Sequence, residues 1–404
     1  MKIVFLAPFG IRPKGTVIAR MAPVAVELQA LGHEVVIVAP PYTNPEDSGK
    51  TELVQGVRLR NVALGPKHKI LAVPFLAWRM FCAALSEKPD LVHLFKPKGY
   101  GGLAVMFLIV LQRAGIRLPP LFLDTDDWEG EGGMNELHAY SEPEKRFYRF
   151  QEQWITRRAV GVSVASRGLE RLVVEMGLPR ERLLYLPNCV ATPVPGDGRA
   201  VRARLCIAPD APVVLLYTRF FEFSQEKLHY LFSEIFRQLP QVRFLVVGKG
   251  RHGEEATLRK VASESGFDAA LVMAGWVEPG EIPHYLAAGD VAIYPFADTL
   301  VNRTKCPAKL TELLLAERAV VADRVGQLAE YIEDGSSGIL CDPDDWQEMA
   351  QRVVELLRSP ERQRSIGTAG RRYLQENFNW GEAALRLVAF YGRLAAGCKH
   401  PLLP

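Results

Sequence analysis

Short apolar, β-branched segments alternate with helical segments along most of this chain, and this alternation constrains the fold more than any other feature. Helical periodicity occupies residues 17–31 and 102–114 of the first half. The apolar segments around them are Ile3–Ala7, Val35–Ala39, Leu91–Leu94, Leu121–Leu123, Val160–Ala165 and Leu183–Leu186. Strands that alternate with helices form parallel, doubly wound sheets. We therefore expect a parallel, doubly wound α/β sheet in the first half.

The same alternation returns after a break. Pro and Gly cluster between about residues 187 and 210, which is typical of a linker or hinge. The strand-like segments beyond it are Val213–Tyr217, Phe244–Val247 and Val291–Pro295. Because 404 residues exceed one ordinary core, we expect two α/β domains, at 1–190 and 191–378. An amphipathic helix in 379–404 is expected to pack back towards the first domain.

Composition excludes several classes of protein. Apolar residues make up 48% and charged residues 24%, which is ordinary for a soluble protein. Six widely spaced cysteines form no metal knuckle or disulfide framework, which favours a reducing cytoplasm. The chain enters a strand at once rather than a signal peptide, and its longest apolar run, Leu103–Leu111, is too short to span a membrane. A net charge of +3 gives no reason to expect nucleic acid as a partner.

Polar residues follow the strands of the second half in a fixed order. Arg219 follows the first strand, and Lys227 comes eight residues later. Gly248 and Gly250 end the second strand, and Glu312 lies early in a helix after the third. The carboxyl ends of parallel strands meet at one crevice, where ligands bind. Two cations, two glycine turns and a glutamate suit a diphosphate and a ribose.

These segments together resemble the family 4 glycosyltransferases, which have the glycosyltransferase-B fold. The segments that carry the resemblance are Thr218-Arg219, Gln225-Glu226-Lys227-Leu228, Val246–Gly250, Ala274–Val277, Ala288–Val291 and Gly326–Glu330. The resemblance covers almost the whole chain. It implies two Rossmann-like domains that face each other across a cleft, a nucleotide-diphosphate-sugar donor on the second and a hydroxyl acceptor on the first. It also implies a retaining outcome with no metal and no cofactor.

The chain departs from the family's pattern at three places. The family's Glu-x7-Glu motif has its second glutamate at Glu312, but Thr304 stands at the first position. The segment 307–312 instead resembles a Pro-x-Lys-hydrophobic-x-Glu variant. Cys189 and Leu228 replace glycines of the family. These departures affect the expected donor and the part played by Thr304, and not the expected fold.

The resemblance and the residue chemistry assign the donor contacts. Arg219 and Lys227 are expected to stabilise the departing diphosphate; the alternative is that both are solvated loop residues. Glu312 is expected to accept hydrogen bonds from ribose hydroxyls; the alternative is an acidic residue placed to suit the helix dipole. Gly248 and Gly250 either let the ligand approach or simply form a turn.

Further donor contacts are expected from the helix that carries Glu312 and from the first strand's loop. The backbone N–H groups of Ala308, Lys309 and Leu310 suit a phosphate, and the Lys309 side chain either touches that phosphate or pairs with Glu312. Thr304 and Gly15 complete the predicted donor site.

The acceptor is expected near the strand that ends at Leu123. Asp126 and Asp127 are predicted to face the reacting groups; the alternative is that they cap the following segment. Asp124 and Asp126 also form an Asp-x-Asp pattern, but we expect no metal there, because the cations supply the positive charge.

Four more residues are predicted to contact the acceptor: Lys14, Arg20, Lys98 and Trp128, the last of these in a glycine-rich loop. Surface solvation is the alternative for Lys14 and Arg20.

Basic and apolar residues between Lys67 and Arg79 suggest a peripheral membrane contact, although Pro74 is expected to interrupt that helix; a core-facing helix end is the alternative. Two rival functions stay open: a noncatalytic sugar-nucleotide-binding protein or partner subunit, and a nucleotide-sugar epimerase.

Overall fold

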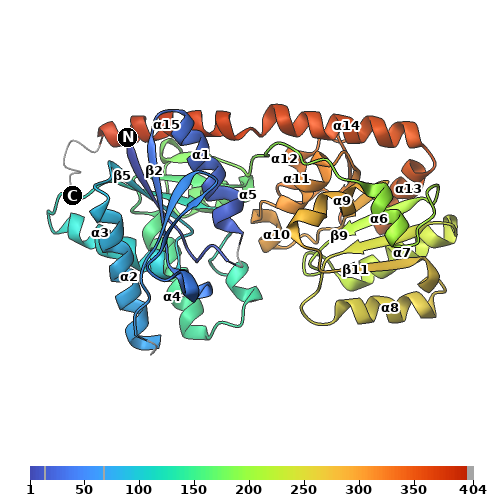
Figure 1. Ribbon diagram of the computed structural model, residues 1–404, viewed down its shortest axis with the longest axis horizontal. Coiled ribbons are helices and arrows are strands. Elements are labelled where there is room, and N and C mark those ends of the chain that lie inside the picture. Colours follow the sequence, from blue (N-terminus) through green and yellow to red (C-terminus); the bar gives the residue numbers. More distant parts are fainter. Residues whose placement is uncertain (13–14, 67–68, 398–404) are drawn as a thin grey trace. The chain divides into compact units, whose positions relative to one another are not determined.

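The computed structural model describes residues 1–12, 15–66 and 69–397. The chain forms two compact units, each of them an α/β body (Figure 1). Unit 1 comprises Met1–Cys189, Thr304–Cys306 and the segment that starts at Phe378. Unit 2 comprises Val190–Arg303 and Pro307–Asn377.

Unit 1 is built on an eight-stranded sheet with the order β3-β4-β2-β1-β5-β6-β7-β8. All neighbouring strands are parallel except β3 and β4. The strands are β1 (Lys2–Leu6), β2 (Glu34–Ala39), β3 (Thr51–Val54), β4 (Val57–Asn61), β5 (Leu91–Phe95), β6 (Leu121–Thr125), β7 (Gly161–Val164) and β8 (Leu183–Tyr185). The central strands are buried on both faces, which explains their continuous apolar sequence.

Helices connect these strands, and the last helix of the chain belongs to the same unit. They are η1 (Val17–Met21, a π-helix), α1 (Ala22–Ala30), α2 (Lys69–Ser86), α3 (Gly99–Arg113), α4 (Glu142–Thr156), α5 (Arg167–Glu175) and α15 (Trp380–Gly397). Figure 1 shows α15 beside α1, and it also packs on β7. The Tyr391 hydroxyl lies 2.5 Å from Nδ1 of His93, a buried residue of β5. This hydrogen bond ties α15 to the interior of the sheet.

Unit 2 is built on six parallel strands with the order β11-β10-β9-β12-β13-β14. They are β9 (Val213–Tyr217), β10 (Arg243–Val247), β11 (Leu271–Gly275), β12 (Val291–Tyr294), β13 (Ala319–Asp323) and β14 (Ile339–Cys341). The helices are α6 (Gly198–Arg204), α7 (Gln225–Gln238), α8 (Glu254–Glu264), α9 (Ile282–Ala287), α10 (Leu300–Thr304), α11 (Ala308–Leu315), α12 (Leu328–Tyr331), α13 (Trp346–Leu357) and α14 (Pro360–Asn377). Apolar side chains of strands and helices fill one continuous core.

The two sheets confirm the expected pair of Rossmann-like α/β units, with three corrections. The predicted linker contains α6, which begins where the Asp197 carboxylate accepts a hydrogen bond from Ala200 N. Pro74 does not interrupt α2, which continues through it from Lys69 to Ser86. The hairpin of β3 and β4 was not predicted. The sequence signal for this hairpin is the dipeptide Gln55-Gly56. It forms a two-residue turn in which both residues have positive φ.

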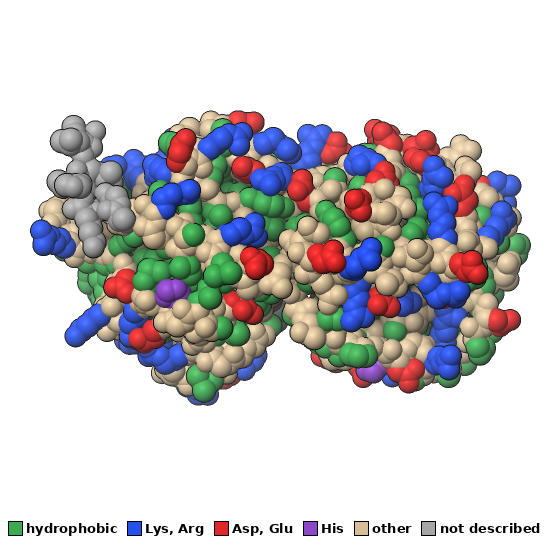
Figure 2. Space-filling model, turned by 90° about the horizontal axis from the view of Figure 1, so that it is seen from above, with side chains coloured by type: hydrophobic (Ala, Val, Ile, Leu, Met, Phe, Trp, Pro, Cys, Tyr) green, Lys and Arg blue, Asp and Glu red, His purple; other side chains and the backbone are tan. Residues whose placement is uncertain are grey.

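Charges are mixed over the surface. On the face of each unit shown in Figure 2, Lys and Arg side chains are interspersed with Asp and Glu.

Candidate active site

Polar residues of unit 2 gather where β9 ends. Arg219 is exposed two residues beyond this strand. The ammonium of Lys309, from the first turn of α11, lies 3.2 Å from the centre of the Tyr217 ring. The Tyr217 hydroxyl forms a hydrogen bond with the carboxylate of Glu312, which also feels the charges of Lys309 and Arg219. The structure therefore brings these three predicted donor residues together around Tyr217, a residue that sequence reasoning did not single out.

The carboxyl group of Glu312 has unusual surroundings. Its side chain is exposed to water, yet the surrounding protein raises its pKa, with burial as the largest cause. The hydrogen bond from Tyr217 and the charges of Lys309 and Arg219 oppose that rise. A carboxylate that water reaches but protein atoms surround lies in a concave part of the surface. Its charge is only partly compensated, so it can accept further hydrogen bonds from a ligand's hydroxyl groups.

The start of α11 adds a second binding element. Pro307 is its N-cap residue, and no side chain caps the first turn. The first N–H groups of a helix lack intrahelical partners and carry its positive dipole end. Ala308 is exposed, whereas the Leu310 side chain is 0% exposed. Leu310 can therefore reach a ligand only through its backbone N–H.

Lys227 is neither exposed nor in a loop. It lies in the first turn of α7, and its Nζ donates to both oxygens of Asp323 at 2.7 and 2.8 Å and to the Pro343 carbonyl at 2.9 Å. The alternative of a solvated lysine is wrong. These three acceptors equal the three N–H donors of an ammonium group. Lys227 therefore forms a buried ion pair with Asp323. Of the two cations predicted to bind the diphosphate, Arg219 is the exposed one.

The two glycines after β10 differ. Gly248 has φ +130°, and a Cβ there would lie 1.9 Å from the Thr218 carbonyl oxygen. Glycine is therefore required at position 248 because the backbone after β10 packs directly against the backbone after β9. Gly250 donates its N–H to Glu255 Oε1 at 2.7 Å, and a Cβ would meet only flexible side-chain ends. The geometry favours the turn interpretation for Gly248.

Thr304 is grouped with unit 1 rather than with the donor candidates of unit 2. It is 2% exposed, and its carbonyl accepts a 2.6 Å hydrogen bond from the Ser166 hydroxyl. Its predicted part in donor binding gains no support from this position.

A charged cluster occupies the corresponding strand ends of unit 1. Phe95 pairs with Asp124 where β5 and β6 end side by side. The next residue, Lys96, is 5% exposed and has φ +62°, a conformation that non-glycine residues rarely adopt. Its ammonium lies 2.9 Å from Asp126 Oδ1 and also hydrogen-bonds Asp127. Lys96 therefore holds both predicted catalytic carboxylates in place, which disfavours their reading as simple caps.

The two carboxylates titrate differently. Burial raises the pKa of Asp126 to about 6; Lys96 lowers it and the adjacent Asp127 raises it. Burial would also raise the pKa of Asp127, but Lys96, Lys305 and Lys98 together hold it below its ordinary value. The two carboxylates titrate as a pair, in which the charged form is favoured at Asp127 over Asp126.

Lys98 extends this cluster. Its Nζ lies 2.6 Å from Glu129 Oε2 and 3.0 Å from Asn135 Oδ1. The backbone N–H of Glu129 donates to the buried Glu152, whose pKa burial and the neighbouring Glu129 raise well above the ordinary value. Burial thus favours the neutral form of Glu152, and Glu129 is the carboxylate paired with Lys98.

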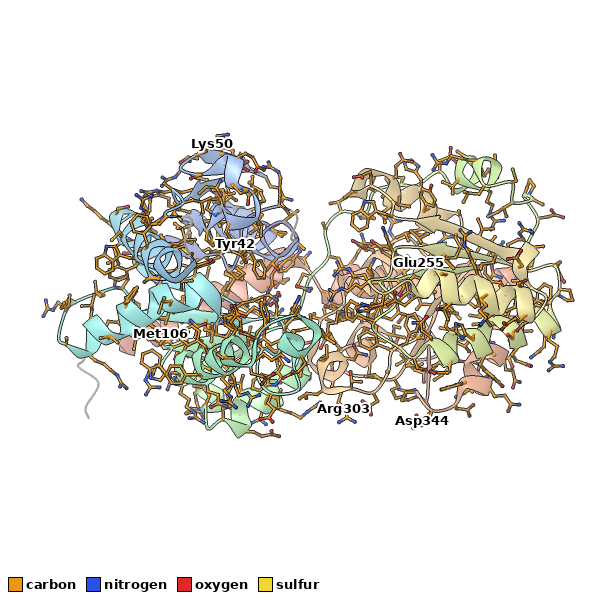
Figure 3. All side chains as sticks on the ribbon, turned by 90° about the horizontal axis from the view of Figure 1, so that it is seen from below. Tyr42, Lys50, Met106, Glu255, Arg303 and Asp344 are labelled. Atoms are coloured by element: carbon orange, nitrogen blue, oxygen red, sulfur yellow. The ribbon has the colours of Figure 1, made fainter. Side chains whose placement is uncertain are left out.

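Lys98 also lines a hollow of about 520 Å³ in unit 1. Its aromatic wall consists of Phe9, Tyr42, Tyr100, Tyr140, Phe147 and Tyr148. The rings of Tyr42, labelled in Figure 3, and Tyr100 lie 5.1 Å apart, as do those of Tyr140 and Tyr148. Burial raises the pKa of Tyr148 to about 12, so its hydroxyl stays protonated at physiological pH. The hollow offers ring faces for stacking and hydroxyl groups for hydrogen bonds.

Arg20 is an interior residue, 1% exposed, so the alternative of surface solvation is wrong and its predicted contact with the acceptor gains no support. Its Nε and Nη2 donate to the two oxygens of Asp124 at 2.7 Å, and Nη2 also donates to the Leu186 carbonyl. Ser163 Oγ donates to Asp124 Oδ2 at 2.5 Å. Both oxygens of Asp124 are therefore bound to side chains inside unit 1. Asp124 is then not available as a ligand, as the Asp-x-Asp metal alternative would require. Among the described residues, no group of three His, Cys, Asp or Glu is placed to hold a metal ion.

The remaining predicted residues have simple settings. Trp128 is 7% exposed, and its Nε1 donates to the Glu131 carbonyl at 2.9 Å. Gly130 and Gly133 pack on its ring, so Trp128 supports the loop from inside. Gly15 is exposed, and a Cβ there would meet nothing within 4 Å. Lys14 lies outside the described residues.

Known protein families match both halves of the chain. The Glycosyl transferase 4-like domain family matches residues 15–189, and the Glycosyl transferases group 1 family matches residues 211–359. A GDP-mannose-dependent α-(1-6)-phosphatidylinositol monomannoside mannosyltransferase of Mycolicibacterium smegmatis is 29% identical over 52% of this chain and 56% of the relative. An MMP α-(1→4)-mannosyltransferase of Mycolicibacterium hassiacum is 30% identical over 67% of this chain and 61% of the relative. The matches thus span little more than half the length of these curated relatives.

Solved structures share the fold over the whole chain. Sucrose-phosphate synthase from Thermosynechococcus elongatus superposes with a TM-score of 0.73 at 19% identity, over 98% of this chain and 100% of the other. Anabaena HepE in complex with UDP gives a TM-score of 0.71 at 19% identity, over 97% and 100% of the two chains. With glycosyltransferase domains matched in both halves and this fold throughout, the protein belongs to the family 4 glycosyltransferases of the glycosyltransferase-B fold.

Proposed function

We propose that the protein transfers a sugar from a nucleotide-diphosphate-sugar donor to a hydroxyl acceptor, with retention of the anomeric configuration and without a metal ion. The observation that carries the proposal is the grouping of Glu312, Lys309 and Arg219 around Tyr217 at the carboxyl end of β9. A concave carboxylate suits the vicinal hydroxyls of a ribose. Nearby cations and a helix start suit the attached diphosphate.

The leaving group accounts for the proposed metal independence. As the bond from sugar to phosphate breaks, negative charge builds on the diphosphate. Donors already fixed around that charge stabilise the transition state without reorganising. Arg219 and the uncapped N–H groups of α11 provide such donors in unit 2. The names of relatives and neighbours include both GDP-mannose and UDP, so we leave the nucleotide base of this chain open.

The acceptor is proposed to bind in unit 1. Asp127 is an ionised carboxylate held by Lys96, and it suits the task of orienting an acceptor or sugar hydroxyl. The aromatic hollow lined by Lys98 is large enough for a small ligand. Aromatic faces stack on sugar rings and also accept apolar chains, so a glycan, a lipid or a small molecule is a suitable acceptor class.

A peripheral contact with an anionic membrane from the cytoplasmic side is part of the proposal. On α2, Leu76 and Ala77 are buried, whereas Phe75 and Trp78 are 37% and 50% exposed. The Arg79 guanidinium lies 4.3 Å from the centre of the Phe75 ring. Exposed aromatic residues beside a cation suit the membrane interface. Among the described residues, no helix is long and apolar enough to cross a membrane. Sedimentation with anionic liposomes at low salt measures the contact.

Replacement of Glu312 by alanine should weaken donor use by about 2–3 kcal/mol in kcat/KM, the scale of lost charge-assisted hydrogen bonds. The reason is that the substitution removes the acceptor proposed for the ribose hydroxyls. The control is Glu317→Ala, five residues further along the chain, because Glu317 lies beyond the other end of α11. Equal kcat/KM in wild type and folded Glu312→Ala would contradict the donor site.

The function itself is tested by incubating the protein with a panel of nucleotide sugars and hydroxyl acceptors and identifying the products. Transfer to an acceptor, undiminished by a metal chelator, is the expected result. Activity that chelator abolishes and manganese or magnesium restores would contradict metal independence. An isomerised sugar nucleotide would indicate an epimerase, and binding without turnover would indicate a noncatalytic protein.

A further inference from the structure

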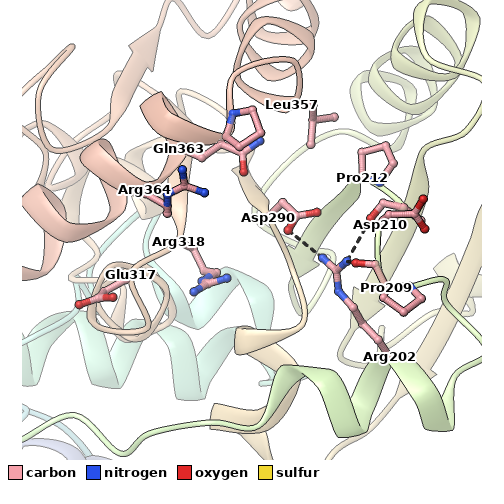
Figure 4. A pocket seen from close by; sticks show the side chains of 12 residues that line it. Arg202, Pro209, Asp210, Pro212, Asp290, Glu317, Arg318, Leu357, Gln363 and Arg364 are labelled. Carbon is pink, nitrogen blue, oxygen red and sulfur yellow. Dashed lines mark hydrogen bonds and ion pairs between the residues drawn. The ribbon is translucent and has the colours of Figure 1, made fainter.

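A second hollow, of about 310 Å³, lies at the amino-terminal edge of the unit 2 sheet (Figure 4). Val291 of β12 pairs with Ala319 of β13. The residues immediately before them, Asp290 and Arg318, therefore meet at that edge and line the hollow. None of the residues proposed to bind the donor lines it.

One arginine of the hollow is fully compensated. Arg202 Nη2 donates to Asp290 Oδ1 at 2.7 Å, and its other nitrogens donate to three backbone carbonyls. The second oxygen of Asp290 accepts the Val213 N–H at 2.7 Å. Both oxygens of the Asp290 carboxylate are therefore hydrogen-bonded, and Arg202 already balances its charge.

Arg318 lacks such a partner. Its Nε donates to the Ala316 carbonyl at 2.8 Å and its Nη1 to the Gly289 carbonyl at 2.5 Å. Across the described parts of the chain, Nη2 of Arg318 has no hydrogen-bond acceptor and Arg318 takes part in no ion pair. Together with the Ala287 carbonyl, which lies 3.5 Å from Nη1, these neutral carbonyls hold the guanidinium in position without neutralising it.

The titration of Arg318 agrees with this geometry. Burial lowers its pKa and Arg202 lowers it further, and Asp290 and Glu317 do not offset these effects. Arg20, the buried arginine of unit 1, shows the opposite: Asp124 keeps its pKa above the ordinary value in spite of burial. Arg318 is thus a half-buried cation that takes part in no ion pair within the described residues.

A second uncompensated guanidinium stands nearby. Arg364, from the second turn of α14, lines the hollow, is exposed and has no ion-pair partner within the described ranges. Figure 4 shows Arg318 and Arg364 on one side of the hollow and the Arg202–Asp290 pair on the other. Glu317 lies 3.1 Å from Arg371, so its charge is already matched. Asp210, an exposed carboxylate, lines the side near Arg202.

We propose that this hollow binds the phosphate monoester of a small hydroxylated metabolite, with the phosphate between Arg318 and Arg364. Guanidinium groups match the oxygens of a phosphate and form short, charge-assisted hydrogen bonds with them. Asp210 then accepts a hydrogen bond from a hydroxyl of the esterified part. A hollow of about 310 Å³ is at the lower end of the range of small-molecule sites.

The site is separate from the proposed donor site. The donor candidates follow the carboxyl end of β9 or start α11, whereas the arginine hollow lies at the amino ends of β9, β12 and β13. Strands of four or five residues separate the two edges by roughly 13–17 Å at about 3.3 Å per residue. A phosphate in the hollow therefore does not occupy the place of the donor diphosphate.

The test is a binding titration at constant ionic strength with inorganic phosphate, a hexose 6-phosphate and the neutral hexose. Wild type should bind both phosphates and not the hexose. Arg364→Ala should weaken both phosphates about tenfold or more, the loss of one charge-assisted contact. Arg362→Ala is the matched control, since Arg362 is exposed on the same helix and does not line the hollow. This variant should bind as wild type does.

A second variant locates the binding. Arg219→Ala changes the proposed donor site and should leave both phosphate affinities unchanged. Loss of phosphate binding in Arg219→Ala, or equal affinity in Arg364→Ala and wild type, would overturn the proposal. Absence of phosphate binding to wild type, or equal binding of the neutral hexose, would also overturn it. None of these readouts requires transferase activity, so failure of the proposed function leaves this test intact.

Discussion

Lys227→Met should destabilise unit 2 by about 3–5 kcal/mol, the cost of leaving one partner of a buried ion pair uncompensated. Asp323, its partner, is 0% exposed and receives both short Lys227 contacts. Asp323 also accepts the Phe296 N–H at 2.7 Å, so it cannot turn away from the buried site without losing a second hydrogen bond. The loss is measured by urea unfolding of wild type and variant.

The stability lost in Lys227→Met should depend on pH. Burial raises the pKa of Asp323 to about 6 even with Lys227 present. The folded state therefore binds more protons than the unfolded state between about pH 4 and pH 6, and stability falls as pH rises through that window. Without Lys227 the window extends upward, so Lys227→Met should cost more at pH 8 than at pH 5.

Two further variants complete the test. Adding Asp323→Asn to Lys227→Met removes the buried charge and should recover much of the stability. Lys260→Met, which affects only a surface pair with Glu264, should change stability by no more than about 0.5 kcal/mol. A Lys227→Met loss as small as this control, or one independent of pH, would contradict the buried ion pair. The same pair means that lost activity in a Lys227 variant does not by itself identify a donor contact.

Asp127→Asn should lower the rate of transfer on the order of a hundredfold or more, the scale of a positioned catalytic carboxylate. Donor affinity should stay unchanged, because Arg219, Lys309 and Glu312, which carry the proposed donor site, belong to unit 2. Asp127 is ionised and held by Lys96, whereas asparagine keeps its shape and loses its charge. The measurement is kcat together with nucleotide-sugar affinity, and Glu131→Gln, an exposed carboxylate of the same loop, is the control.

The pH profile provides an independent readout. Asp126 and Asp127 titrate as a pair, so an acid limb near pH 6 belongs to both. Removal of the Asp127 charge removes one cause that raises the Asp126 pKa, so the limb should move to lower pH. Donor affinity lost in parallel with kcat, or an unmoved limb, would contradict the assignment.

The sequence predicts the positions of strand-end residues well. Arg219, Asp126 and Asp127 were placed from the order of the strands together with the family resemblance, because parallel strands present their following residues at one edge. Glu312 was placed by its distance from a helix start. The same reasoning predicted the two sheets, whose buried strands read as continuous apolar runs.

Pairings across long stretches of chain could not be predicted in this way. Lys227 and Asp323 are 96 residues apart, and Arg20 and Asp124 are 104 apart. Each was interpreted from its neighbours in the sequence, and nothing there indicates which distant carboxylate neutralises an arginine or lysine. For the same reason Lys96 was not singled out as a site residue, although it holds both catalytic candidates.

The most direct test of the account is the anomeric configuration of the product, read by NMR from an α-linked nucleotide sugar that the protein accepts. A retaining transfer needs no protein base on the acceptor hydroxyl, because the departing phosphate takes the proton, and protein groups only position it. We expect an α-linked product. A β-linked product would contradict the proposed mechanism and would make Asp126 or Asp127 the general base of an inverting transfer.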